Sequence, residues 1–325
     1  MLPLKVQYMS DLHLEFEDNR EYFKYHPISP SGDILILAGD INYLSEYNSD
    51  YMQKWFRQLS DMFLEVFIIP GNHEFYLSED DEIAVERYLE MTNSFDGLKD
   101  LKFSNVAATL GPINSSRVTK YFFSDNGISN IHFLNNASFT LDGSYFTPDQ
   151  AKESGYDSIK IIGTTLWSNI NAVHPIPKNV GMSDWYYYYD ANLRLYPDII
   201  KKVYDKSVTY IQNELRMSQE KQCNIIVTHH CPSIQPFVRS SDDWNKIKEE
   251  YQDGLISCYA SELANRRFFR EDGYNPDYWI YGHNHYKEYP INECEVFKTK
   301  LLKNTFGYSF EGHSKICKFN GDKLC

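Results

Sequence analysis

The sequence predicts an α/β protein, and two observations support this fold class. Apolar runs of strand length alternate with polar turns and with stretches of helical spacing between positions 1 and 75. Of the 325 residues, 42% are hydrophobic and 24% are charged, so the chain can bury a large core. Length alone allows one large domain or two modest ones, and we expect a single domain over residues 1–325.

Three strands are expected in this N-terminal part of the chain, and each one ends in residues that can do chemistry. The strands cover residues 6–9, 34–38 and 66–69. Apolar residues at helical spacing over residues 51–59 predict a helix between the second and third strands, with Ser49 as its N-cap. A further helix is expected over residues 80–92, where Ser78 and Asp81 stand in capping-box register.

The rest of the chain is expected to add a second set of strands and an insertion. Short alternating runs predict antiparallel strands or a second sheet over residues 118–123, 131–134, 139–141 and 159–163. Residues 168–206 contain three prolines and an aromatic block at 185–189, so we expect an aromatic-rich insertion that covers one face. Helices are then expected over 207–218 and 261–270, strands over 224–228 and 278–281, and only weak strands near the C-terminus.

Charge and composition exclude several classes of function. The chain has 45 acidic and 32 basic residues, and its net charge of −13 repels both nucleic-acid phosphates and anionic membrane surfaces. We therefore expect no membrane partner and consider nucleic acid an unfavourable partner. No apolar run is long enough to cross a bilayer, and no secretory signal is recognisable. The six cysteines form no C-x-x-C pair, which favours free thiols and a cytoplasmic location.

Polar residues of one chemical kind collect at the ends of the expected strands. They are hard oxygen and borderline nitrogen donors, without a thiolate: Asp11, His13, Asp40, Asn72, His73, His229, His283 and His285. Ligands of open α/β sheets bind at the carboxyl ends of the strands, so we expect these residues to form one pocket. Any one of them alone is weak evidence, because a single histidine beside a strand is usually a surface or core residue. Their number indicates two metal ions.

These motifs resemble those of the calcineurin-like metallophosphoesterases. The matching segments are Asp11-Leu12-His13, Gly39-Asp40, Gly71-Asn72-His73-Glu74, Thr228-His229 and Gly282-His283-Asn284-His285, and the resemblance spans residues 4–290. It implies a four-layer αββα sandwich with two mixed sheets and a dinuclear metal site at the strand ends. It also implies a hydrolase that acts on phosphoester bonds.

The resemblance implies a role for each residue. The first metal ion would be held by Asp11, His13 and His285, and the second by Asn72, His229 and His283. Asp40 would bridge both ions, and His73 would contact the phosphoryl group, so the expected catalytic residues are His73, Asn72 and Asp40. His230 is the alternative to His229, but the family pattern favours the first histidine of such a pair.

The chemistry that follows is hydrolysis by a hydroxide that two divalent cations generate from water. Nitrogen and oxygen ligands suit Mn²⁺, Fe or Zn²⁺, with manganese a natural candidate. The expected substrate is a small phosphodiester or a nucleotide, although a phosphomonoester stays open. The sequence does not predict the oligomeric state.

One branch of the family differs from this chain in an informative way. Protein serine/threonine phosphatases read Gly-Asp-x-x-Asp-Arg-Gly, where the second Asp orients the catalytic histidine. Here Tyr43 stands at the place of that Asp, which disfavours a protein phosphatase and leaves open what orients His73. Two alternatives remain: a nuclease similar to the double-strand-break repair exonucleases, and a noncatalytic binding scaffold of the same fold.

Overall fold

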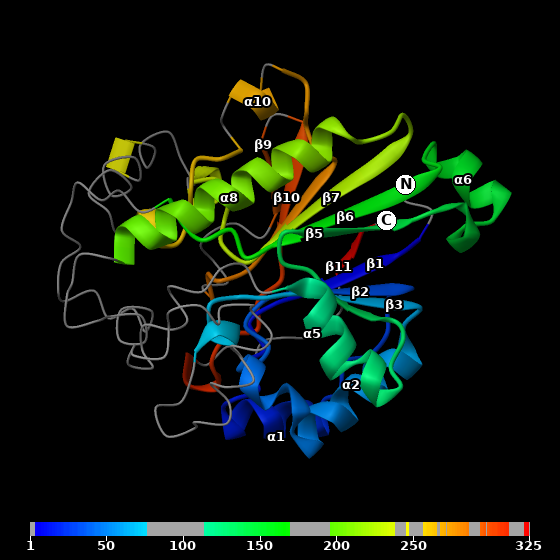
Figure 1. Cartoon of the computed structure of the whole chain (residues 1–325), viewed down its shortest axis with the longest axis vertical. Coiled ribbons are helices and arrows are strands. Elements are labelled where there is room, and N and C mark those ends of the chain that lie inside the picture. The colour runs from blue at the N-terminus through cyan, green and yellow to red at the C-terminus, as the bar shows by residue number, and fades with distance from the viewer. Residues whose placement is uncertain are drawn as a thin grey trace.

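The computed structural model describes residues 4–76, 114–169, 196–237, 245–246, 256–264, 267–270, 272–285, 293–296, 298–311 and 322–324. In this part of the chain, two sheets pack face to face, and helices cover their outer sides (Figure 1). The predicted α/β class and the implied four-layer sandwich with two mixed sheets are therefore confirmed.

The first sheet has the strand order β11-β1-β2-β3-β4. Its strands are β1 (Val6–Met9), β2 (Ile34–Ala38), β3 (Glu65–Ile69), β4 (Ile131–Phe133) and β11 (Asp322–Leu324). Strands β1 to β4 are parallel, and β11 pairs with β1 in the antiparallel sense. The carboxyl ends of β1, β2 and β3 therefore lie side by side, which brings their following loops together.

The second sheet has the order β5-β6-β7-β8-β10-β9. Its strands are β5 (Ala137–Leu141), β6 (Ser158–Thr164), β7 (Gln222–Thr228), β8 (Tyr278–Tyr281), β9 (Glu293–Val296) and β10 (Thr299–Lys303). The four inner strands are parallel, whereas β5 and β9 are antiparallel edge strands. The loops after β7 and β8 thus share one edge of this sheet.

Helices flank both sheets. Against the first sheet lie α1 (Glu17–Tyr25), α2 (Asp50–Met62) and α5 (Ser115–Phe122), and against the second lies α8 (Tyr196–Arg216) (Figure 1). The shorter helices are α6 (Pro148–Ser154) and α10 (Arg267–Arg270). Single 3₁₀ turns occur at Leu44–Asn48, His73–Phe75, Ser124–Asn126, Gly143–Tyr145, Gln235–Phe237, Ile256–Cys258 and Ser309–Glu311.

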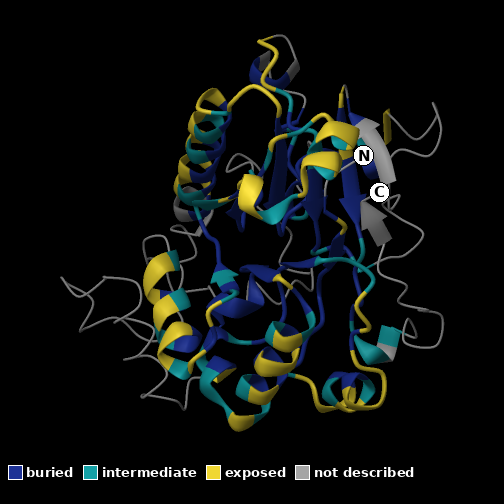
Figure 2. Ribbon diagram, turned by 90° about the vertical axis from the view of Figure 1, so that its right-hand side faces the viewer, coloured by how far each residue is buried: buried dark blue, intermediate teal, exposed yellow. Residues whose placement is uncertain are grey.

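The strands are apolar on both faces because each sheet is covered on both sides. In β2, Ile34 and Ile36 point between the two sheets, while Leu35 and Leu37 point toward the helices. Full burial of each such side chain contributes about 1.5 to 3 kcal/mol. Figure 2 shows the result as buried strands in the interior and exposed residues on the outer faces of the helices. The core thus holds the strand ends, and the loops that follow them, in fixed positions.

The predicted helix behind Ser49 is confirmed, whereas a predicted strand over residues 118–123 is wrong. The Ser49 hydroxyl accepts a hydrogen bond of 3.3 Å from the backbone N–H of Met52. Residues 118–122 instead belong to α5, whose N-cap is Asn114. β-Branched and aromatic residues there favour a strand locally, but Val118 and Phe122 are one helical turn apart and both are buried. Burial of that face therefore favours the helix over the strand.

Two helix boundaries also differ from prediction. Helix α8 begins at Tyr196, so the last part of the region predicted as an insertion over 168–206 is helical, and it ends at Arg216 rather than 218. Residues 261–264 are not helical, and the helix predicted over 261–270 is reduced to Arg267–Arg270 in the described residues. The helix predicted over 80–92 and the aromatic block at 185–189 lie outside the described residues. None of the described helices has the length and apolarity that crossing a membrane requires.

Candidate metal centre

The loops after five strands bring the predicted site residues together. Asp11 follows β1, Asp40 follows β2, and Asn72 and His73 follow β3. From the second sheet, His229 follows β7, and His283 and His285 follow β8. Most of these side chains are buried, and His283 and His285 are partly exposed. The site therefore lies where the carboxyl-terminal edges of both sheets meet.

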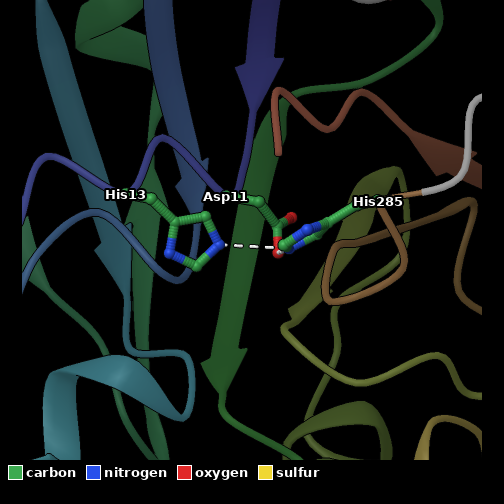
Figure 3. A group of neighbouring side chains, drawn as sticks. All are labelled: Asp11, His13 and His285. Carbon is green, nitrogen blue, oxygen red and sulfur yellow. Dashed lines mark hydrogen bonds and ion pairs between the residues drawn. The ribbon is translucent and has the colours of Figure 1, made fainter. Parts of the chain in front are cut away.

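The first group consists of Asp11, His13 and His285, whose ligand atoms all lie within 4.8 Å of one another. Figure 3 shows the three side chains pointing toward a common point. Nε2 of His285 lies 3.2 Å from Oδ1 of Asp11 and 3.1 Å from Nε2 of His13. The Asp11 carboxylate also accepts from the backbone N–H of His283, which lies 3.0 Å from Oδ1 and 3.1 Å from Oδ2.

The outer nitrogens of both histidines face carboxylates. Nδ1 of His13 lies 2.8 Å from Oε1 of Glu15, and Nδ1 of His285 lies 3.0 Å from Oε2 of Glu311. A carboxylate favours the proton on the nitrogen that faces it, which leaves the Nε2 lone pairs pointing at each other. Two lone pairs at 3.1 Å repel unless a cation lies between them. The donor set therefore fits a metal ion.

A proton can substitute for that cation. Burial lowers the pKa of His285, but hydrogen bonds with Asp11 and Glu311 outweigh burial and raise the pKa to about 10. A metal ion at this group must displace the proton, because only the neutral imidazole binds metal.

The second group consists of Asp40, His229 and His283. Nε2 of His229 lies 3.2 Å from Oδ2 of Asp40 and 2.9 Å from Oδ1 of Asn72. The Nδ1–H of His229 donates to the backbone carbonyl of Ala38 at 2.9 Å, so its Nε2 presents a lone pair toward two oxygen acceptors. Three acceptors that face one another again fit a cation.

The amide of Asn72 is oriented by a neighbour. Its Nδ2 donates to the hydroxyl of Tyr76 at 2.8 Å, which leaves Oδ1 turned toward His229. The role of Tyr76 as a partner of Asn72 comes from the structure. A neutral amide oxygen completes the group without adding charge.

His283 and His230 differ in their surroundings. Nε2 of His283 is buried and lacks a hydrogen-bond partner within the described residues, as expected for an atom that binds a metal ion. The His230 ring packs on His283 at 4.2 Å and on Trp167 at 5.5 Å between ring centroids. His229, not His230, is the histidine that faces Asp40. Trp167 is itself buried, so it belongs to the core rather than to an open stacking surface.

Asp40 lies between the two groups. Its Oδ2 is 3.2 Å from Nε2 of His229, 3.8 Å from Nε2 of His13 and 3.9 Å from Nε2 of His73. Its Oδ1 accepts a hydrogen bond of 2.9 Å from the backbone N–H of His73. Burial alone raises the pKa of Asp40, but the surrounding imidazoles hold it well below its usual range. Asp40 is therefore an anion that both groups can use.

The backbone at several of these positions adopts the left-handed conformation. Asp11, His13, Asp40 and His283 have φ angles of 57°, 48°, 55° and 68°. Such a conformation costs each residue about 1 to 3 kcal/mol and is concentrated at functional sites, where the surrounding structure enforces it. The sharp reversals turn the side chains back over the strand ends, toward the common centre.

Gly39 allows His229 to approach the loop after β2. Gly39 has φ of 90°, and a Cβ atom there would clash with Nδ1 of His229 and come within 2.7 Å of the backbone nitrogen of Gly71. We expect Gly39→Ala to lower both the free energy of unfolding and the metal content. Gly155→Ala is the matched control, because Gly155 has φ of 77° and nothing within 4 Å of the added atom. In the control, the free energy of unfolding should fall by only about 1 to 2 kcal/mol, the cost of a left-handed backbone for a residue that has a Cβ atom.

Urea denaturation and elemental analysis of both glycine variants measure this difference. If Gly39→Ala costs no more stability than Gly155→Ala and keeps its metal, the close approach of Gly39 to His229 is not required for the site.

Glu74 connects two of the strand-end loops. Its Oε2 accepts hydrogen bonds from the backbone N–H groups of Gly71 at 2.6 Å and Asp40 at 3.0 Å. Its Oε1 accepts from the backbone N–H of Ile41 at 2.8 Å and from the hydroxyl of Tyr47 at 3.1 Å. Burial and the nearby Asp40 carboxylate raise the pKa of Glu74 to about 7. This buried carboxyl group sets the position of Asp40 relative to the loop that carries Asn72 and His73.

Three further residues of the site are missing from the sequence prediction. They are Glu15, which contacts His13 and His73 through Oε1, Glu311, which contacts His285, and Tyr308, whose hydroxyl lies 3.3 Å from Nε2 of His73. Glu15 stands two residues after His13, and a carboxylate at this short distance from an expected ligand is a usable signal. Tyr308 and Glu311 follow weakly patterned strands, and nothing in the sequence marks them.

Comparisons with known proteins identify the family of the chain. A family model described as calcineurin-like phosphoesterase matches residues 4–193. A protein named uncharacterized protein L509, from Acanthamoeba polyphaga mimivirus, is 26% identical over 94% of this chain and 92% of its own.

Two solved structures are also similar. The phosphopantetheinyl hydrolase of Mycobacterium tuberculosis superposes with a TM-score of 0.59 and 15% identity, over 97% of this chain and 93% of that one. A dimetal phosphatase from Danio rerio aligns with a TM-score of 0.37 and 10% identity, over 94% and 88% of the two chains. The similarity to the phosphopantetheinyl hydrolase is a similarity of fold. Because the family model covers more than half of the 325 residues, the chain belongs to the calcineurin-like phosphoesterase family, which carries out metal-dependent hydrolysis of phosphoesters.

Proposed function

We propose that this protein hydrolyses a small phosphodiester or a nucleotide by means of two divalent cations. The observation that carries this proposal is the pair of imidazole and carboxylate groups on either side of Asp40. In both groups, acceptor atoms face one another at distances that only a cation or a proton makes favourable. Residues 1–325 would form one catalytic domain.

Seven residues would hold the cations. Asp11, His13 and His285 would bind the first, Asn72, His229 and His283 the second, and Asp40 both. When bound, two such cations supply positive charge for the phosphoryl oxygens and lower the pKa of a water molecule. The absence of a thiolate from this set favours Mn²⁺, Fe or Zn²⁺.

His73, Asn72 and Asp40 would act on the substrate and the site beside the cations. His73 keeps its Nδ1 toward Glu15 and turns Nε2 toward Asp40 and the Tyr308 hydroxyl. When both ring nitrogens carry protons, a charge that the Glu15 carboxylate offsets, Nε2 can donate a hydrogen bond to a phosphoryl oxygen or give its proton to the leaving oxygen. Asn72 and Asp40 act by fixing the charge and shape of the site.

The proposal is tested by hydrolysis of bis-p-nitrophenyl phosphate and p-nitrophenyl phosphate, with Mn²⁺ and with a chelator. We expect Mn²⁺-dependent hydrolysis, faster for the diester, and complete loss with the chelator. Faster hydrolysis of the monoester would show that the protein is a monoesterase rather than a diesterase. Degradation of single-stranded DNA would favour the nuclease instead, and inactivity of fully metal-loaded protein toward every substrate would favour the scaffold.

The choice of natural substrates to test follows from the similar structures. Because a protein of this fold is a phosphopantetheinyl hydrolase, a phosphopantetheinyl ester belongs in the first panel beside nucleotides. Screening this panel with metal-loaded protein is the measurement that narrows the substrate.

A further inference from the structure

The position that orients the catalytic histidine in protein serine/threonine phosphatases is occupied by an aromatic residue in this chain. Tyr43 stands there, and its ring lies 6.3 Å from the His73 ring between centroids, at an angle of 20°. A tyrosine ring stacked at this distance contributes no anionic acceptor. If His73 is held in one orientation by a carboxylate, that carboxylate must come from elsewhere in the chain.

Glu15 supplies such a carboxylate from the loop after β1. Its Oε1 lies 2.6 Å from Nδ1 of His73 and 2.8 Å from Nδ1 of His13. The Glu15 side chain is 4% exposed and the His73 side chain 6%, so water competes little for these contacts. One carboxylate oxygen thus accepts from an expected metal ligand and from the expected catalytic histidine at the same time.

The second oxygen of Glu15 shows that packing alone does not explain this arrangement. Oε2 is buried and has no hydrogen-bond partner among the described residues. A buried acceptor without a partner costs about 1 to 3 kcal/mol, and more when it is charged. A residue that served stability alone would avoid this cost, for example as a glutamine that finds a second partner or as an apolar side chain. The carboxylate is thus costly to keep and is directed at two histidines of the site.

We infer that Glu15 is the positioning residue of His73: its carboxylate holds the proton on Nδ1 and fixes the ring so that Nε2 faces the reacting phosphoryl group. This inference rests on the proposed function. The free end of the ring agrees with it, because Nε2 lies 3.9 Å from Oδ2 of Asp40 and 3.3 Å from the Tyr308 hydroxyl. Glu15 acts through His73 and does not touch the substrate.

A double-mutant cycle of Glu15→Gln and His73→Gln tests the inference, because Gln keeps the size of the side chain and removes its charge. With Mn²⁺ at saturation, Glu15→Gln should lower kcat roughly 10- to 100-fold and leave KM nearly unchanged, as orienting partners typically do. In the His73→Gln background, Glu15→Gln should cause no further loss of kcat. If the kcat losses of the two single variants multiply in the double variant, or if saturating Mn²⁺ restores the kcat of Glu15→Gln, Glu15 acts only through His13 and the metal. Either result overturns the inference.

Glu311→Gln is the matched control for the cycle. Glu311 also places a carboxylate on an expected ligand histidine, with Oε2 3.0 Å from Nδ1 of His285, whereas Glu15 contacts His73. Its substitution should weaken Mn²⁺ binding, and its effect on kcat should multiply with that of His73→Gln. A kcat effect of Glu311→Gln that vanishes in the His73→Gln background would mean that the cycle does not isolate Glu15.

A spectroscopic measurement tests the contact without any activity. In ¹⁵N-histidine-labelled protein, the His73 signals, identified by their absence from His73→Gln, should show a proton on Nδ1 and a low-field Nδ1–H resonance. Glu15→Gln should shift or remove that resonance. A His73 whose Nδ1 carries no proton in the native protein overturns the inference. This measurement needs no substrate, so it tests the contact between Glu15 and His73 even if the native protein is inactive. Inactivity alone would count against the proposed function only.

Discussion

An Asp40→Asn protein is expected to lose metal and activity together. Asn has the same size and keeps one oxygen for the backbone N–H of His73, which donates to Oδ1 of Asp40 at 2.9 Å. It removes the negative charge that lies between His13 and His229. Removing one partner of a buried charged group typically costs about 3 to 5 kcal/mol, which corresponds to roughly 10²- to 4 × 10³-fold in metal affinity. Catalysis should fall at least as far, since both groups depend on this carboxylate.

Elemental analysis of the purified variant and activity across a range of Mn²⁺ concentrations measure the two losses. Asp205→Asn is the matched control, because it removes the same charge from an exposed ion pair with Lys201 on α8. The control should keep normal metal content and turnover. An Asp40→Asn protein with full metal content and normal turnover would falsify the assignment of Asp40 as a residue that both groups share.

A His73→Gln protein is expected to show the opposite separation, with activity lost and metal retained. Nδ1 of His73 contacts Glu15, and the ring belongs to neither of the two groups on either side of Asp40. A general acid or hydrogen-bond donor to the phosphoryl group contributes roughly 10²- to 10⁴-fold, so kcat should fall by that amount. KM and the metal content should change little.

The metal content of His73→Gln is the decisive measurement, since His73 also forms a third convergent group with His13 and Glu15. Metal loss comparable to that of Asp40→Asn would show that His73 binds a cation through this group. In that case Glu15 would be a ligand as well, and the assignment of His73 as a donor outside the metal groups would be wrong.

The sequence predicts much of the site because the chemistry and the strand pattern coincide. Asp11 and Asp40 follow neighbouring parallel strands of the first sheet, and His229 and His283 follow neighbouring parallel strands of the second, so each pair ends at one edge of its sheet. This rule requires no knowledge of side-chain packing. That the two edges meet comes from the packing of the sheets. Whether the residues so gathered bind two metal ions stays a prediction until metal content is measured.

What the sequence does not predict depends on contacts between distant segments. Glu311 and Tyr308 reach the site because Gly307 and Ser309 are held against α1, where Asn19 donates to the carbonyl of Gly307 at 3.0 Å and accepts from the N–H of Ser309 at 3.1 Å. No periodicity near the C-terminus indicates this. In the same way, Val118 in α5 has a local preference for a strand, and only burial with Phe122 against the sheet reveals the helix.

The four hydrogen bonds accepted by Glu74 have a consequence for the rate of metal exchange. They join the loops after β2 and β3 into one unit before any cation arrives. Cation uptake on this side of the centre then requires no slow rearrangement of these loops, and its speed should be set by the loss of coordinated solvent from the incoming ion. In a chain that lacks this carboxyl group, uptake would instead wait for two independent loops to meet.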